Sequence, residues 1–238
     1  MITLAIDTSE ARGSVALLRD GQRCAGAVHS ERTDYSEWLI PAVEEVLRIA
    51  GTRMAVADLF AVATGPGSFT GVRVGLTAVK AWCEVYGKPV VGVSRLEAMA
   101  RLVTAEAGMV AASYDAQRGQ LFGAIYRSSY GRLARIGDEM VIAPEAFLDL
   151  AAREAGDGAI HWACLDPELV TGLKGWPARS SRGDVMTEAT SELAAKIGLI
   201  AEEKAGRGEF SDPLELDANY VRRSDAEIFW KGPSAHAR

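Results

Sequence analysis

Residues 65–75 read GPGSFTGVRVG, the most informative run in this chain. The apolar residues 59–63 precede this run and have the length and composition of a buried strand. Apolar residues at helical spacing follow it over 76–86. The run is therefore predicted to form a turn between a strand and a helix. Its glycines allow positive φ angles and a close approach of another backbone segment, and Ser68 or Thr70 can cap the helix.

Two interpretations of this turn differ in function. The unpaired N–H groups at the start of a helix suit an anion such as a phosphate. The spacing, however, matches neither common phosphate loop, because no Lys-Ser or Lys-Thr pair follows the last glycine and Phe69 and Thr70 break the G-x-G-x-x-G order. We favour a structural turn that lets the helix pack closely on its strand. The candidates for nucleotide or anion contact are Asp7, Thr8, Ser9, Gly65, Gly67, Ser68, Phe69, Thr70, Gly71, Arg73 and Asp115.

The rest of the chain alternates apolar runs of strand length with amphipathic runs of helix length. In the first half we predict strands at 2–6, 13–18, 22–30, 58–64 and 90–93, and helices at about 36–50, 72–86 and 95–106. A hairpin turn at Asp20-Gly21 joins the second and third strands. In the second half we predict strands at 109–114, 121–126 and 160–164, helices at about 144–155 and 187–205, and a loop over 166–186.

The two halves share a pattern in which a strand ends at an aspartate, a polar turn follows and a second strand returns. Asp7 holds this position in the first half and Asp115 in the second. This repetition predicts an internally duplicated α/β fold with a cleft between the halves. We expect a first lobe over residues 1–105 and a second over 106–238, with the segment 213–231 packing back on the first lobe.

Composition excludes several classes of protein. The formal net charge of the 238 residues is −6, which argues against independent binding to a nucleic-acid backbone. The three cysteines are far apart, lie in apolar surroundings and form no C-x-x-C pair, which indicates buried free thiols in a reducing cytoplasm. The N-terminus has no basic leader, and no apolar run approaches the roughly 18 residues that span a bilayer. We expect a cytoplasmic protein with no membrane contact.

The sequence offers few residues for catalysis. Its three histidines share no metal-ligand spacing, and neither an H-E-x-x-H nor a G-x-S-x-G motif occurs. We therefore predict no metal site and no hydrolase triad. Asp7 and Asp115, at the ends of central strands, are the carboxylates that could hold a hydrated Mg²⁺ beside nucleotide phosphates. The alternative, which we favour, is that each caps its own turn through its side chain.

Five short motifs together resemble those of the TsaB (YeaZ) family. They are Ile6-Asp7-Thr8-Ser9, the run 65–75, Gly92-Val93-Ser94-Arg95-Leu96-Glu97-Ala98, Tyr114-Asp115-Ala116-Gln117-Arg118-Gly119 and Asn219-Tyr220-Val221-Arg222. The resemblance is dense over about 1–130 and returns near 220. It implies an actin-like, duplicated α/β fold of the sugar-kinase type, with two subdomains built on mixed central sheets, which agrees with the repetition described above.

The resemblance also implies a function. Proteins of this family are subunits of the complex that installs the threonylcarbamoyl group on the anticodon-adjacent adenosine of tRNAs that read codons beginning with A. The chain is then expected to be a non-catalytic scaffold that binds and activates the catalytic subunit TsaD, assembles with the ATPase TsaE and reaches tRNA only through the complex. It is expected to form a homodimer when alone. It is expected to have no cofactor of its own, and the boundary with TsaD is the expected place for any ATP or ADP and Mg²⁺.

Two residues depart from the family pattern. Tyr35 stands where relatives commonly carry a histidine, which weakens a metal role further. Gln120 stands where an acid is usual, which weakens a working nucleotide cleft. The kinship with M22 glycoproteases implies no proteolysis here. The alternative function is an independent actin-fold small-molecule kinase or nucleotide hydrolase, which would need a metal-holding acid, phosphate-binding glycines in both halves and a base.

The helices at 36–50 and 72–86 carry more apolar residues than one buried stripe requires. Trp38, Ile40 and Trp82 lie off the best inward faces, and exposed aromatic residues are typical of association surfaces. The alternative is that each helix is buried on two sides within its own domain. We favour an interface. Its candidate residues are Trp38, Leu39, Ile40, Val43, Leu47, Leu76, Val79, Lys80, Trp82 and Cys83.

Overall fold

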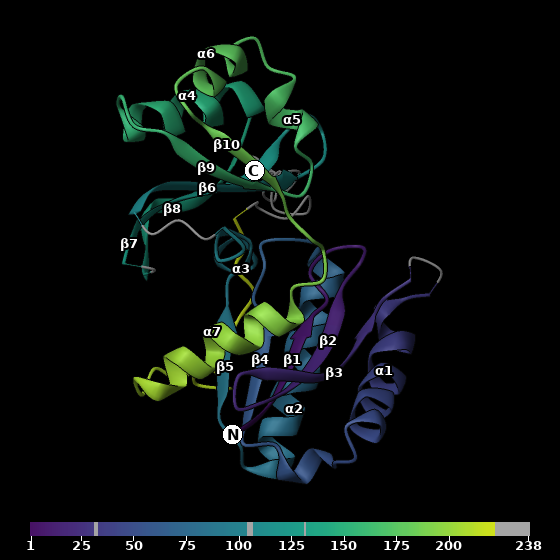
Figure 1. The fold of residues 1–238 in the computed structure, drawn as a ribbon. Coiled ribbons are helices and arrows are strands. Elements are labelled where there is room, and N and C mark those ends of the chain that lie inside the picture. The colour runs from purple at the N-terminus through teal and green to yellow at the C-terminus, as the bar shows by residue number, and fades with distance from the viewer. Residues whose placement is uncertain (31–32, 104–106, 131, 222–238) are drawn as a thin grey trace, which may run out of the picture.

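The computed structural model describes residues 1–30, 33–103, 107–130 and 132–221. These residues form two lobes, each built on a five-stranded sheet (Figure 1). Within these ranges, no helix is long and apolar enough to cross a membrane. Residues 222–231 of the predicted returning segment lie outside the described part of the chain.

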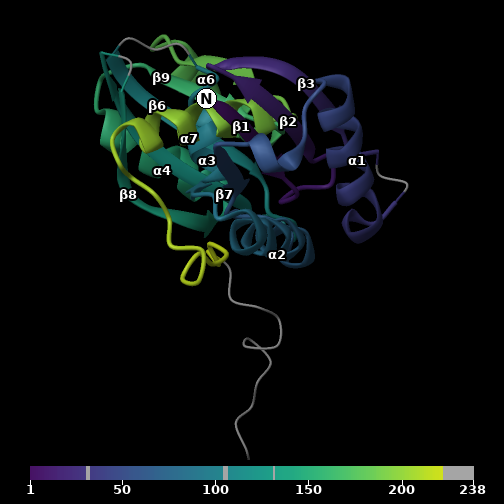
Figure 2. The same cartoon turned by 90° about the horizontal axis from the view of Figure 1, so that it is seen from below.

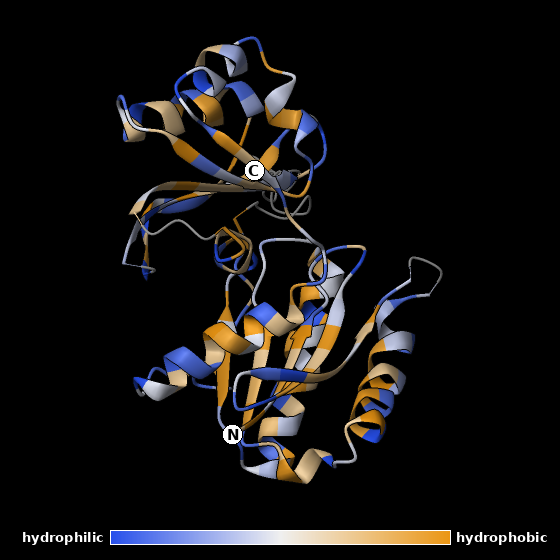
Figure 3. Ribbon diagram, viewed as in Figure 1, coloured by the Kyte–Doolittle hydropathy of each residue, from blue (hydrophilic) through white to orange (hydrophobic). Residues whose placement is uncertain are grey.

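The sheet of the first lobe has the strand order β3-β2-β1-β4-β5. Its strands are β1 (Ile2–Asp7), β2 (Ser14–Arg19), β3 (Gln22–Val28), β4 (Leu59–Ala63) and β5 (Val90–Val93). The first three pair in antiparallel fashion, whereas β1, β4 and β5 run parallel. The hairpin between β2 and β3 turns at Asp20 and Gly21, as predicted, and both residues have positive φ. Figure 3 shows that the central strands β1 and β4 are predominantly hydrophobic.

Helices cover both faces of this sheet. The helices α1 (Tyr35–Ile49) and α2 (Phe69–Tyr86) lie beside each other on one face (Figure 2), and their buried side chains share a core with Ile6 of β1. The other face is covered by α7 (Ala194–Gly206), which shares a core with Ala5 of the same strand. The neighbouring residues Ala5 and Ile6 face opposite ways because side chains alternate along a strand.

Helix α7 corrects the predicted division into lobes. The prediction places residues 106–238 in the second lobe, yet α7 packs on β1, β2, β4 and β5 of the first sheet. The segment after α7 continues along the first lobe, where Leu216 joins the core. An amphipathic pattern indicates which face of a helix is apolar, but it does not say which of two sheets that face covers.

The second lobe repeats the topology of the first. Its strands are β6 (Ala107–Asp115), β7 (Leu121–Ser129), β8 (Arg132–Ile142), β9 (Ile160–Cys164) and β10 (Val185–Glu188). Their order is β10-β9-β6-β7-β8, with β6, β7 and β8 antiparallel and β6, β9 and β10 parallel. The helix α4 (Pro144–Ala155) packs against this sheet, and α3 (Arg95–Ala100) lies between the lobes (Figure 1). The repeated topology confirms the predicted internal duplication.

Several elements of the second half differ from the prediction. Residues 166–186, predicted as a loop, contain α5 (Glu168–Thr171), α6 (Trp176–Ser180) and the start of β10. The helix predicted from residue 187 begins only at Ala194, because the residues of β10 pair with β9 instead. The prediction also lacks β8, which is mostly solvent-accessible and rich in charge, so that its side chains show no clear apolar alternation.

Candidate functional site

The glycine-rich turn connects β4 to α2, as predicted. Ser68 caps this helix, since its side-chain oxygen accepts a hydrogen bond from the N–H of Gly71 over 3.3 Å. The carbonyl of Gly65 accepts a hydrogen bond from the N–H of Arg95, the first residue of α3, over 2.8 Å. The turn therefore ties the beginnings of two helices to the end of β4.

The same turn packs against the residues that follow β1. The N–H of Ser68 donates to the carbonyl of Ser9 and the hydroxyl of Thr8 donates to the carbonyl of Gly71, each over 2.7 Å. A Cβ atom at Gly67 would lie 2.0 Å from the Ser9 carbonyl oxygen, and one at Gly71 would lie 2.1 Å from that of Thr8. Only glycine lets the two backbone segments meet here, because the chain itself occupies the space into which a Cβ atom would project.

Asp7, the last residue of β1, is fully buried and forms an ion pair with Arg95. Its Oδ1 atom accepts a hydrogen bond from the N–H of Ser9 over 2.9 Å and another from the hydroxyl of the same residue. The guanidinium of Arg95 lies 5.3 Å from the ring centroid of Tyr114. Both carboxylate oxygens thus have partners within the chain. A hydrated Mg²⁺ at Asp7 does not fit, because Arg95 already supplies the positive charge.

Asp115, the last residue of β6, caps its own turn. Its Oδ1 accepts a hydrogen bond from the N–H of Gln117 over 2.7 Å, and its Oδ2 accepts one from the side-chain amide of Gln117 over 2.9 Å. The N–H of Asp115 donates to the carboxylate of Asp166, whose pKa is raised by burial. In the part of the chain that the structure describes, no group of three His, Cys, Asp or Glu side chains is arranged to hold a metal ion.

A cleft of about 580 Å³ lies between the two lobes. Tyr114 of the second lobe donates a hydrogen bond from its hydroxyl to the carbonyl of Pro66 in the first, and burial raises the pKa of this phenol. Of the candidates for nucleotide or anion contact, the cleft brings together Ser9, Gly67, Ser68, Phe69 and Asp115. Four other candidates are buried and do not line it, namely Asp7, Thr8, Gly65 and Gly71.

A groove of about 490 Å³ runs between α1 and α2. Its lining residues are Ser36, Leu39, Ile40, Phe69, Thr70, Arg73, Val74, Thr77 and Ala78. Leu39 and Ile40 belong to the predicted interface, and Ile40 is 46% exposed. Thr70 and Arg73, predicted as anion contacts, lie here rather than in the cleft, whereas Phe69 lines both. The prediction misses the α2 side of the groove, although the turns of a helix that begins at Phe69 would place these residues on one face.

Burial corrects the other part of the predicted interface. Val43, Leu47, Leu76, Val79 and Cys83 lie in the core of the first lobe and do not line the groove. Val79, for example, is 0% exposed. Because these side chains pack in the core of their own lobe, they offer little surface to a partner. Burial also raises the pKa of the Cys83 thiol.

The remaining three interface candidates are partly covered by their own domain. Trp38 packs edge-on against His29 with 5.0 Å between ring centroids, and Trp82 packs against Phe60 at 5.9 Å. The ammonium of Lys80 contacts the carbonyl of Leu214 over 3.5 Å. The contacts of the two tryptophans therefore agree with the alternative interpretation, in which each helix is buried on two sides within its own domain.

Tyr35, which departs from the family pattern, holds the turn that follows β1. Its hydroxyl accepts a hydrogen bond from the N–H of Gly13 over 2.5 Å and donates one to the carbonyl of Glu10. Its ring stacks on His29 with 4.2 Å between the centroids, and burial raises the pKa of the phenol. The residue therefore has a structural role in attaching α1 to this turn.

Three comparisons with known proteins indicate the family of this chain. Residues 28–166 match the family model described as TsaD, tRNA N6-adenosine threonylcarbamoyltransferase. The tRNA threonylcarbamoyladenosine biosynthesis protein TsaB of Bacillus subtilis is 30% identical over 239 residues, which cover 97% of this chain and 98% of that protein. The solved structure of YeaZ from Pseudomonas aeruginosa has a TM-score of 0.75 and 27% identity, and the match covers 92% of this chain and 99% of that one.

A more distant structural match is to a sugar kinase. The crystal structure of the ROK hexokinase from Thermus thermophilus has a TM-score of 0.51 at 13% identity, over 87% of this chain and all of that one. At this identity the likeness shows the fold alone, and it confirms the predicted actin-like architecture. With nearly complete coverage of its relative in sequence, the chain belongs to the TsaB (YeaZ) family of tRNA threonylcarbamoyladenosine biosynthesis proteins.

Proposed function

We propose that this chain is a non-catalytic scaffold subunit that binds and activates the catalytic subunit TsaD in the synthesis of threonylcarbamoyladenosine on tRNA. The observation that carries the proposal is the ion pair of Asp7 with Arg95. Phosphoryl-transfer enzymes need an acidic side chain that holds a metal ion beside the phosphates. Here the acid at the end of β1 is fully buried and neutralised by a cation of the same chain.

The second acid and the glycines also argue for a scaffold. Asp115 uses both carboxylate oxygens to cap its own turn. On the side where a Cβ atom would project, the space beside Gly67 and Gly71 is filled by the backbone of Ser9 and Thr8, so that these glycines serve the packing of the chain on itself. None of these contacts favours the alternative of an independent kinase or nucleotide hydrolase. Any nucleotide with Mg²⁺ at the boundary with TsaD stays a prediction.

The groove between α1 and α2 is the surface that we assign to TsaD. Arg73 is the one charged side chain among its nine described lining residues, and the others are apolar or small and polar. Such a surface suits a partner segment that inserts apolar side chains and places a carboxylate opposite Arg73. The same groove is exposed in the isolated chain, which supports a homodimer when TsaD is absent.

The remaining partners follow from charge and family. A net charge of −6 supports contact with tRNA only through the complex, because independent binding to phosphates needs a basic face. Membership of a tRNA-modification family supports assembly with the ATPase TsaE and a place in the cytoplasm.

The groove can be tested with two exposed isoleucines of the same helix. Ile40 lines the groove, whereas Ile49 is 54% exposed near the end of α1 and does not line it. We expect Ile40→Asp to weaken binding of the full chain to TsaD at least about tenfold, because it buries a charge in an apolar contact. Ile49→Asp should bind as the unchanged chain does. Calorimetric titration with purified TsaD measures both.

Activity supplies the second readout. TsaD should modify tRNA more rapidly when the unchanged chain is present, and Ile40→Asp should reduce this activation in proportion to the lost binding. The chain alone should not turn over ATP. Sustained ATP hydrolysis by the chain alone, at a rate typical of kinases, would contradict the proposal. So would full activation of TsaD by a chain that does not bind it.

A further inference from the structure

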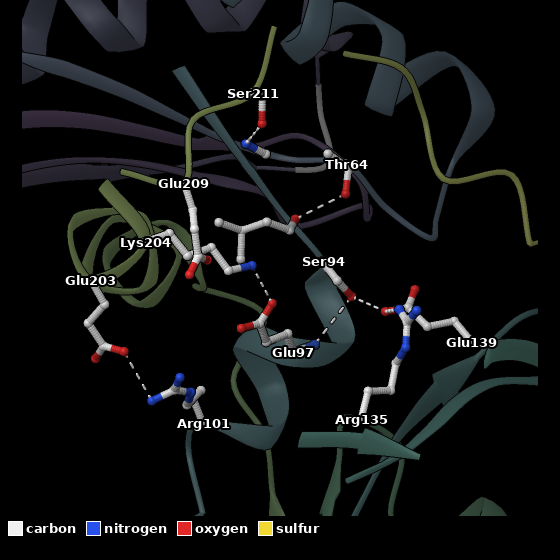
Figure 4. A network of polar contacts seen from close by, with 12 residues as sticks. Thr64, Ser94, Glu97, Arg101, Arg135, Glu139, Glu203, Lys204, Glu209 and Ser211 are labelled. Atoms are coloured by element: carbon white, nitrogen blue, oxygen red, sulfur yellow. Dashed lines mark hydrogen bonds and ion pairs between the residues drawn. The ribbon is translucent and has the colours of Figure 1, made fainter. Parts of the chain in front are cut away.

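The segment that follows α7, residues 207–221, is fixed along the first lobe. The N–H of Ser211 donates to the carbonyl of Val90 over 2.9 Å, and its hydroxyl accepts from the N–H of Gly92 over 3.0 Å. Leu216 is buried above Gly92, where a Cβ atom would lie 2.7 Å from the leucine Cδ1. The segment thus covers the edge of β5 (Figure 4) and is anchored by an apolar side chain.

The end of this segment is held from both lobes. The N–H of Asn219 donates to the carbonyl of Thr64 over 2.8 Å, and its side-chain amide donates to the carboxylate of Glu139. Glu139 belongs to β8 of the second lobe and also accepts from the hydroxyl of Ser94, the cap of α3, with Arg135 at 3.4 Å (Figure 4). One buried carboxylate therefore joins the second lobe, the start of α3 and the C-terminal segment.

The next residue, Tyr220, reaches the groove. Its hydroxyl accepts a hydrogen bond from Nε of Arg73 over 2.7 Å, and its ring centroid lies 5.4 Å from that of Phe69. The guanidinium carbon of Arg73 lies 3.6 Å from the Phe69 centroid and 5.5 Å from that of Tyr220. We call these three side chains the Phe69–Arg73–Tyr220 stack. Phe69 and Tyr220 are both exposed, so the stack faces solvent.

The stack lies where the groove meets the cleft. Phe69 and Arg73 line the groove between α1 and α2, and Phe69, Asn219 and Tyr220 line the cleft between the lobes. Exposed aromatic and arginine side chains carry a large share of the energy at protein interfaces. The two aromatic rings hold the guanidinium before binding, which lowers the entropy lost when a carboxylate pairs with it. Its two terminal nitrogens have no hydrogen bond within the described part of the chain.

We infer that the Phe69–Arg73–Tyr220 stack is part of the TsaD-binding surface and that Glu139 is its positioning residue, acting through Asn219. This inference rests on the proposed function and extends the surface from the two helices to the C-terminal segment. The partner segment places an apolar side chain in the groove and a carboxylate on Arg73. The second lobe, which does not line the groove, influences binding through the carboxylate of Glu139.

Alanine substitution of exposed residues tests the surface. We expect Tyr220→Ala and Arg73→Ala each to weaken binding of the full chain to TsaD at least about tenfold in calorimetric titrations. The control is Tyr130→Ala, since Tyr130 is 97% exposed on the second lobe and lines neither cavity. Its affinity for TsaD should equal that of the unchanged chain. All three variants should keep the melting temperature of the unchanged chain within a few degrees, because the residues are exposed.

A double-substitution cycle tests the positioning role. Asn219→Ala removes the hydrogen bond to Glu139 without changing any residue of the second lobe, and Glu139→Ala removes the same bond by changing its acceptor. Each should weaken binding of TsaD, and neither should weaken it further in a Tyr220→Ala chain, because both act through Tyr220. Losses that simply add would overturn the positioning role. Glu139→Ala also loses the contacts of Glu139 with Ser94 and Arg135 and can lower the melting temperature. The test does not depend on this variant, since Asn219→Ala removes the same hydrogen bond and keeps those contacts.

The outcomes separate the two proposals. Failure of the unchanged chain to bind TsaD would overturn the proposed function and this inference with it. Normal binding by the unchanged chain and by Tyr220→Ala alike would overturn the inference alone. Weaker homodimerisation of Tyr220→Ala, measured by sedimentation, with unchanged affinity for TsaD would assign the stack to a second copy of this chain and would also overturn it.

Discussion

Replacing Arg95 with alanine should destabilise the chain more than any surface substitution. Arg95 and Asp7 are both fully buried and pair with each other across 88 positions of sequence. The substitution removes the cation and leaves the carboxylate of Asp7 buried, with only the N–H and hydroxyl of Ser9 as partners. A buried charge without a counter-ion is a large cost because water cannot solvate it.

The magnitude follows from the burial of both groups. Removing one partner of a buried ion pair costs about 3–5 kcal/mol in the free energy of unfolding. For a chain of 150–250 residues, each kcal/mol lowers the melting temperature by about 2–4 °C, so we expect a decrease of roughly 6–20 °C. A second substitution, Asp7→Asn, removes the uncompensated charge in the Arg95→Ala chain and should recover part of that loss.

Calorimetric melting of the four chains, unchanged, Arg95→Ala, Asp7→Asn and the double variant, gives the coupling between the two residues. Arg207→Ala is the control, because Arg207 pairs with Glu209 on the surface and its loss should leave the melting temperature nearly unchanged. A single variant Arg95→Ala that melts with the unchanged chain would refute the reasoning. So would a double variant that is less stable than Arg95→Ala alone.

Two further predictions concern the glycine-rich turn and the thiols. Gly71→Ala should lower the free energy of unfolding, measured with urea, by about 1–3 kcal/mol, because the new Cβ atom meets a backbone oxygen. Gly206→Ala, which has open space around it, should not lower it. Equal stability of the two variants would contradict the geometry. In the folded chain a thiol reagent should modify only the exposed Cys24, since Cys83 and Cys164 are buried. Burial raises the pKa values of both thiols, that of Cys164 to about 12. Rapid reaction of more than one thiol per chain before denaturation would contradict this prediction.

Local signals in the sequence predict much of the fold. The hairpin at Asp20-Gly21 and the strand-to-helix turn over 65–75 carry turn residues whose backbone requirements are specific, and both lie where predicted. The strand–aspartate–return pattern at Asp7 and Asp115 marks the first hairpin of each lobe, and the repetition predicts the duplication. Each of these signals lies within a few neighbouring residues.

The candidate site depends on contacts that no local signal carries. Arg95 follows a strand and begins a short helix, and nothing in its local spacing marks it as the partner of Asp7. Part of the predicted interface lies in the core for a related reason. The apolar residues of α1 and α2 do form faces, but the inward face is wide enough to include Val43 and Val79, which leaves the groove to Ile40 and its neighbours.

The polar contacts between the lobes bear on how freely the two lobes can move relative to each other. Kinases of related architecture close their lobes around a nucleotide by hinge motion. Here Tyr114 of the second lobe is bonded to the carbonyl of Pro66, and Glu139 is bonded to Ser94 and Asn219. Opening the cleft would break these hydrogen bonds, at a net cost of about 0.5–1.5 kcal/mol for the bond of Tyr114 and about 1.5–3 kcal/mol for each bond to the charged Glu139.

These contacts therefore disfavour opening of the lobes, and a surface that is ordered before binding loses less entropy on association. Motion of the second lobe would also affect the groove. Because Glu139 bonds to the segment that carries Tyr220, any displacement of the second lobe that breaks the Glu139–Asn219 bond would release the Phe69–Arg73–Tyr220 stack at the same time. If the stack binds TsaD as we propose, the second lobe thus acts on this surface by keeping that segment in place, without lining the groove itself.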